Sequence, residues 1–116
     1  MRDFYTKLEC DGKEYILAFD LNVMEAIQEE YETLDKWQSL IYPKKGEPNM
    51  KAMIFGFTEM LNEGLDIESE KTNVTYKPFT KKQVGRLLTA IGLENASEKM
   101  GDAIVKANED DSSKNV

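Results

Sequence analysis

The chain has 116 residues and a formal net charge of −7, with 41% hydrophobic and 32% charged residues. This length fits one domain with a modest core, and the acidic balance argues against nucleic-acid binding, which usually needs a basic face. No apolar run approaches the roughly 20 residues that span a bilayer. The first residues, Met1–Phe4, lack the pattern of a signal peptide, and the single cysteine, Cys10, excludes an internal disulfide. We therefore expect a cytosolic protein that does not contact membranes.

The sequence contains no histidine. Ser–His and Cys–His catalytic pairs therefore cannot form, and a zinc site of the usual composition is not expected. No GxxxxGK[ST] or GxGxxG phosphate-binding motif is present. Chemistry carried by carboxylates alone is conceivable, but no pair of acidic residues stands out from the general acidity. We expect a protein that is not an enzyme and that has no catalytic residues, cofactor or metal site.

Residues 3–20 predict a β-hairpin. Asp11-Gly12 is a strong signal for a two-residue turn of type I′. A lone hairpin is not stable in water, so we expect its apolar face to cover helices. Folding the chain about the turn gives four cross-strand pairs on that face: Phe4–Phe19, Thr6–Leu17, Leu8–Tyr15 and Cys10–Lys13.

A first helix is predicted after Asn22, with Asn22 as its N-cap and Glu25 completing a capping box. The apolar residues around Trp37 are rotated away from the stripe of this helix. Either the helix bends near Asp35, or Asp35 caps a new short helix, and we prefer the second interpretation. Trp37 is expected to anchor the core, with an exposed contact to a partner as the alternative.

A central helix is predicted between Pro48, which suits a helix entry, and Gly64, which suits a helix end. Phe55 lies on the face opposite to its apolar stripe. Either a neighbouring segment covers Phe55 or this second face binds a partner, and we favour burial beneath residues 65–79. The stripe consists of Met50, Met53, Ile54, Phe57, Met60 and Leu61.

The last third of the chain predicts a long polar connection at 65–79, with a short extended piece at 74–76, and then two helices. The first of these helices begins after Thr80, with Gln83 at capping-box spacing, and ends at Gly92. The second begins after Asn95.

These elements predict an α+β fold in which an N-terminal β-hairpin packs on a small bundle of four to five helices. Residues 1–108 are expected to form a single domain. Residues 109–116 are expected to form a disordered acidic tail, because they are rich in serine and acidic residues and have no apolar pattern.

Several segments of the chain follow one another in an order that resembles a known protein family. The resemblance extends over about residues 3–105 and consists of ordinary residue types in a fixed order, with no chemical signature. The segments are Leu17–Asn22, Met24–Tyr31, Leu34–Trp37, Gly56–Gly64, Thr80–Leu88 and Ile91–Leu93. Their order resembles the tail assembly chaperones of long-tailed, siphovirus-type phages and prophages of Gram-positive bacteria.

The resemblance implies a protein of the host bacterial cytoplasm that coats the apolar, helical tape measure protein before the major tail (tube) protein polymerises around it. Such a protein is absent from the mature virion, and self-association is a further implied property. A cover for apolar helices needs adaptable contacts, which methionines provide, although a methionine stripe is more often core. The predicted partner-binding residues are Trp37, Met53, Phe55 and Met60.

Two other functions stay open at this point. One is a structural phage component, such as a tail completion or head–tail connector protein. The other is an acidic regulator that mimics DNA or inhibits a host protein, which would require an ordered and widely distributed acidic surface.

Overall fold

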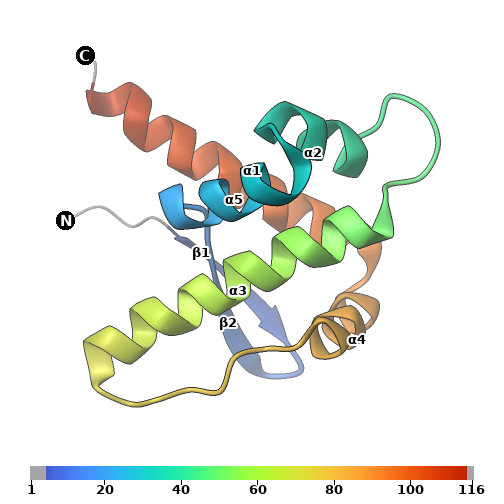
Figure 1. Ribbon diagram of the computed structural model, residues 1–116. Helices are drawn as coiled ribbons and strands as arrows, with labels where there is room; N and C mark the ends of the chain where they lie inside the picture. Colours follow the sequence, from blue (N-terminus) through green and yellow to red (C-terminus); the bar gives the residue numbers. More distant parts are fainter. Residues whose placement is uncertain (1–4, 115–116) are drawn as a thin grey trace.

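The computed structural model describes the backbone of residues 5–114 and the side chains of residues 5–107. This part of the chain forms a two-stranded hairpin followed by five helices (Figure 1). Helix α3 (Met50–Thr72) packs along strand β2 (Lys13–Ala18), and helix α5 (Leu93–Lys114) packs against strand β1 (Tyr5–Cys10). Helices therefore support both strands, and the predicted α+β class is confirmed.

The hairpin turns at Asp11 and Gly12, whose φ angles are 52° and 78°. Positive φ at both central residues is the geometry of a type I′ turn, which matches the twist of the flanking strands. The predicted register is confirmed for three pairs, whereas the predicted Phe4–Phe19 pair lies outside the described residues. The confirmed pairs are Thr6–Leu17, Leu8–Tyr15 and Cys10–Lys13.

Helix α1 (Leu21–Tyr31) is capped by Asp20, whose Oδ1 accepts a hydrogen bond of 3.2 Å from the backbone N–H of Val23. The predicted capping box of Asn22 and Glu25 is wrong, because the chain enters the helix two residues earlier. Asn22 lies inside the first turn of α1. The helix itself was predicted correctly.

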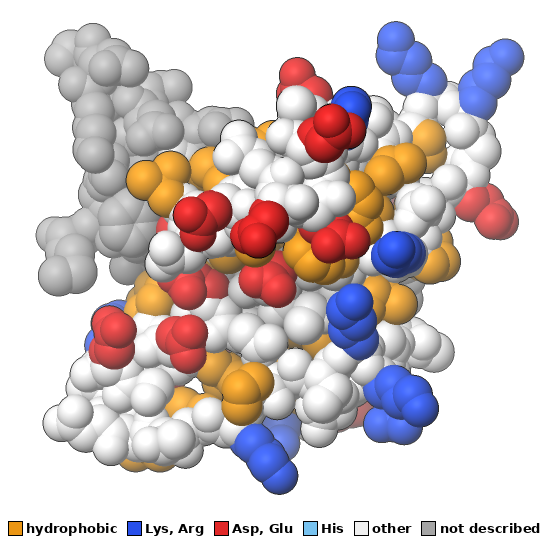
Figure 2. All heavy atoms as spheres, in the orientation of Figure 1, with side chains coloured by type: hydrophobic (Ala, Val, Ile, Leu, Met, Phe, Trp, Pro, Cys, Tyr) orange, Lys and Arg blue, Asp and Glu red, His pale blue; other side chains and the backbone are white. Residues whose placement is uncertain are grey.

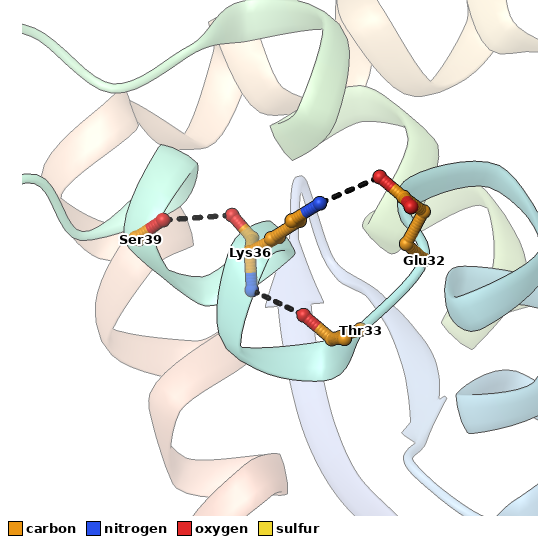
Figure 3. A network of polar contacts seen from close by, with 4 residues as sticks. All are labelled: Glu32, Thr33, Lys36 and Ser39. Carbon is orange, nitrogen blue, oxygen red and sulfur yellow. Dashed lines mark hydrogen bonds and ion pairs between the residues drawn. The ribbon is translucent and has the colours of Figure 1, made fainter.

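Helix α2 (Leu34–Ile41) is a separate short helix, which confirms the preferred interpretation of this region. Its N-cap is Thr33, so the prediction that Asp35 caps it is wrong. The Thr33 Oγ1 atom accepts a hydrogen bond of 3.0 Å from the backbone N–H of Lys36 (Figure 3).

The junction between α1 and α2 turns at Glu32, which has φ 73° and ψ −50°. The N–H of Thr33 donates to the carbonyl oxygen of Tyr31 at 2.9 Å, so Glu32 is the central residue of a γ-turn with positive φ, which is a strained geometry. The Lys36 ammonium donates to Glu32 Oε1 at 2.6 Å (Figure 3) and lowers the pKa of that carboxyl group. A sharp turn, spanned by an exposed ion pair, therefore separates α2 from α1.

Helix α3 begins after its N-cap Asn49 and continues to Thr72, where Asn73 ends it with a left-handed φ of 58°. The predicted end at Gly64 is wrong. Gly64 is buried where the helix crosses β2, and a Cβ atom there would overlap the carbonyl oxygen of Ile16. The glycine permits close packing and does not end the helix. The polar connection shrinks accordingly to residues 73–80, which contain no strand.

The hairpin and all five helices contribute buried side chains to the core. Trp37 is 0% exposed, its Nε1 donates to the carbonyl oxygen of Ala52 at 3.0 Å, and its ring stacks on Phe19 at 6.1 Å between centroids. Most of the predicted α3 stripe is buried, but Ile54 is half-buried and Met50 is exposed. The buried members are Met53, Phe57, Met60 and Leu61.

Helix α4 (Lys81–Ile91) has the predicted capping box between Thr80 and Gln83, and it ends at Gly92, whose φ is 89°. Helix α5 begins at Leu93, earlier than predicted. Its backbone is helical to Lys114 and so includes most of the predicted tail at 109–116. Residues 115–116 lie outside the described residues.

Candidate protein-binding surfaces

The structure separates the four predicted partner-binding residues into two groups. Trp37, Met53 and Met60 are 0% exposed. As core residues they have no surface to offer a partner in this fold, so their prediction as contact residues is corrected. Phe55 is half-buried and lies on the other face of α3, so its contact with a partner stays a prediction.

Phe55 is covered by α1 and not by the segment after residue 64. Its ring meets Tyr31 edge to face, with 5.6 Å between the centroids and 72° between the planes. The Tyr31 hydroxyl oxygen is buried and has no hydrogen-bond partner among the described residues. The face of α3 that bears Phe55 is thus partly closed by a neighbouring aromatic side chain.

A groove with an apolar lining lies between β2, the C-terminal half of α3 and the segment 73–80, and we call it the β2–α3 groove. Its volume is about 280 Å³. Three further residues, Glu14, Gly64 and Glu68, complete its wall. The apolar lining consists of Tyr15, Ile16, Leu61, Leu65, Tyr76 and Phe79.

The segment 73–80 forms one wall of the groove and is held mainly at its ends. The side chain of Asn62 accepts from the N–H of Phe79 at 2.7 Å and donates to its carbonyl oxygen at 3.2 Å. The ring of Phe79 also lies 5.9 Å from that of Tyr15. Between residues 75 and 78 the backbone makes no hydrogen bond with other described residues. Tyr76 in this stretch is 39% exposed, so the wall presents an apolar side chain to solvent.

A second hollow lies beside the hairpin, and we call it the hairpin hollow. Its volume is about 550 Å³, and residues 7–11 line one side of it. Cys10 lines this hollow, and the pKa of its thiol is raised. Partial desolvation is the larger cause and the neighbouring Asp11 carboxylate is the second. A raised pKa disfavours a reactive thiolate. The opposite side is formed by Ala90, Ile91, Asn95 and Lys99, where α4 gives way to α5.

Charge is unevenly distributed over the face in Figure 2. Acidic side chains gather over α1 and the middle of α3, whereas basic side chains lie around α4 and on the loop after α2. Exposed acids of α1 include Glu25 and Glu29, and exposed bases of α4 include Lys82 and Arg86. The acidity is therefore concentrated on part of this face and does not extend across it.

A pair of carboxyl groups joins α1 to α3. Glu63 lies beside Asp20, and the hydrogen bond between these carboxyl groups, together with partial desolvation, raises the pKa of Glu63 to about 7. Asn22 Nδ2 donates a hydrogen bond of 3.0 Å to Glu63 Oε2, and this bond lowers the pKa of Glu63 and so offsets part of the rise. Near neutral pH, Glu63 is therefore protonated in a large fraction of the molecules.

Among residues 5–107, no group of three or more Asp, Glu or Cys side chains is arranged to hold a metal ion. No helix in the described part of the chain is both long and apolar enough to cross a membrane. A scan against protein-family models, a search of curated proteins and a search of solved structures gave no match.

Proposed function

We propose that this protein is a phage tail assembly chaperone that binds the tape measure protein, and that the β2–α3 groove receives apolar side chains of that partner. The observation that carries the proposal is the apolar lining of the groove, with Tyr76 exposed on a wall that is fixed mainly at its ends. A concave apolar surface with an adaptable wall suits a partner that offers many similar apolar segments. The order of sequence segments described above supports the same proposal.

The charges around the groove indicate the chemistry of the bound segment. Glu14 and Glu68 lie at its wall, and the whole chain carries a net charge of −7. A helical segment with apolar residues at positions i and i+4 and a flanking Lys or Arg would complement both the lining and these carboxylates. In the proposed role the protein acts in the host cytoplasm, keeps the tape measure protein soluble, helps to recruit tube subunits and is absent from the virion.

Co-expression with the tape measure protein tests the proposal. The wild-type chain should keep the tape measure protein soluble and co-purify with it. Leu65→Glu and Tyr76→Glu place a charge in the groove, and each should reduce co-purification about tenfold or more, because an unpaired charge would face the apolar segment. Leu21→Glu is the matched control, since Leu21 is 80% exposed and lies outside the groove.

Two outcomes would contradict the proposal. The first is a tape measure protein that stays insoluble with nothing co-purifying. The second is a pair of folded groove variants that co-purify as well as the Leu21→Glu control. Proteomics of purified virions separates the structural alternative, because a tail completion or connector protein should be present in the particles and a chaperone should be missing.

A further inference from the structure

Strand β1 has an open edge. The two-residue turn makes Cys10–Lys13 a hydrogen-bonded pair, and the pairs alternate along an antiparallel ladder. Tyr5, Lys7 and Glu9 therefore point their backbone N–H and C=O groups away from β2. Within the described chain, no hydrogen bond outside the hairpin engages these groups. Such an edge is a template for pairing with another strand.

A hollow borders the same strand. Residues 7–11 line the hairpin hollow, whose far wall is formed by Ile91 of α4 and by Asn95 and Lys99 of α5. An added strand would lie about 4.8 Å from β1 in the direction of its hydrogen bonds. The hollow has a volume of about 550 Å³ and also contacts Glu14 of β2, so it adjoins the hairpin at its turn end.

The side chains along the edge specify which strand would fit. Lys7 pairs with Glu14 at 3.7 Å, whereas Glu9 lies directly opposite Glu14 in the register and has no ion pair among the described residues. Leu8, between them, faces the core and is buried. Opposite charges and apolar pairs stabilise cross-strand neighbours. The fitting strand would therefore present a base opposite Glu9, an apolar residue opposite Leu8 and an acid opposite Lys7.

When this pattern is followed along an antiparallel strand, it reads base, apolar residue, acid. Residues 7–9 of this chain, Lys7-Leu8-Glu9, have this sequence. We propose that two copies of the chain pair antiparallel through their β1 edges, with Leu8 opposite Leu8 of the second copy. Each Lys7 then lies opposite Glu9 of the second copy, and the two hairpins form one four-stranded sheet about a twofold axis.

The paired edges are short, so the dimer should be weak, with a Kd on the order of micromolar or higher. The β2–α3 grooves lie on the β2 side of each hairpin, away from the joined edges. If those grooves bind the tape measure protein as proposed above, the dimer would offer two sites to one long partner, which increases avidity. Dimer formation itself does not depend on that function.

Sedimentation equilibrium of the full chain tests the pairing. The wild type should show a reversible monomer–dimer equilibrium. Lys7→Glu and Glu9→Lys each place like charges across the twofold axis and should weaken association about tenfold. The double variant K7E/E9K restores opposite charges and should recover most of the affinity. Lys13→Glu makes the same charge change on β2, away from the edge, and should associate like the wild type.

Two further measurements keep the test decisive if a charge variant fails to fold by circular dichroism. Lys7→Pro removes an outward N–H without touching the β1–β2 ladder and should give a monomer. In the wild type, hydrogen exchange at the amides of Lys7 and Glu9 should slow as protein concentration rises. A wild type that remains monomeric at every soluble concentration would overturn the proposal. A dimer that forms equally well in the folded single variants would overturn it too.

Discussion

Replacing Gly64 with alanine places a methyl group where α3 crosses β2. A Cβ atom at this position would overlap the carbonyl oxygen of Ile16 and lie 3.1 Å from the Ile16 Cβ atom. The overlapped oxygen belongs to the backbone of a paired strand, so it cannot rotate away as the end of a side chain can. Either α3 or β2 must shift.

Two opposing effects determine how much Gly64→Ala changes the free energy of unfolding. Alanine is favoured over glycine inside a helix by about 1 kcal/mol. Overpacking a well-packed contact costs about 1–3 kcal/mol, and a clash with backbone belongs at the upper end of that range. We therefore expect Gly64→Ala to lower the free energy of unfolding by about 1–2 kcal/mol.

Gly85→Ala in α4 is the matched control. Its Cβ atom would lie 3.9 Å from the Cδ1 atom of Ile54, an ordinary contact, so only the gain in helix propensity of about 1 kcal/mol remains. Urea unfolding followed by circular dichroism should shift the midpoint down for Gly64→Ala and up for Gly85→Ala. If both variants are stabilised alike, α3 and β2 do not touch at Gly64 and the reasoning is refuted.

Two other predictions concern the α1 region. The pKa of Glu63 rises from 4.5 to about 7 in the fold, so its contribution to stability is complete below about pH 4.5 and is lost as pH increases through about 7. Because this carboxyl is largely solvated, we expect a loss of about 1 kcal/mol. Glu63→Gln should match the wild type at pH 4.5 and exceed it at pH 8 in urea unfolding, and identical pH profiles would exclude the carboxyl pair. Glu32→Gly should raise the urea midpoint, because glycine accepts φ 73° without strain and the lost pair with Lys36 is exposed. A lower midpoint would show that the ion pair outweighs the strain.

The hairpin could be predicted from sequence because its determinants are local. Asp11-Gly12 selects the turn, and the apolar residues on either side agree with only one register. The capping box at Thr80 is likewise contained within four residues. The N-cap of α1 was harder to predict from sequence, since Asp20 and Asn22 are both suitable caps. Which of them caps the helix depends on where β2 ends.

Gly64 shows why the extent of α3 was mispredicted. A glycine after an apolar stripe is typical of a helix end, but it equally permits a close crossing, and only the position of Ile16 distinguishes the two. The spacing of Leu61 and Leu65 continues the helical period and could have indicated the longer helix.

The β2–α3 groove could not be predicted because it joins β2, the second half of α3 and the segment ending at Phe79. These segments are far apart in sequence, and no motif links them. The sequence did identify Phe55 as unusual, but its cover, Tyr31, comes from α1 and not from the expected segment.

Hydrogen exchange on the complex co-purified with the tape measure protein tests the central claim most directly. Binding in the β2–α3 groove should slow exchange in β2, at residues 61–68 and along 73–80, relative to the free chain. Slower exchange confined to the Phe55 face of α3, with these three segments unchanged, would contradict the account.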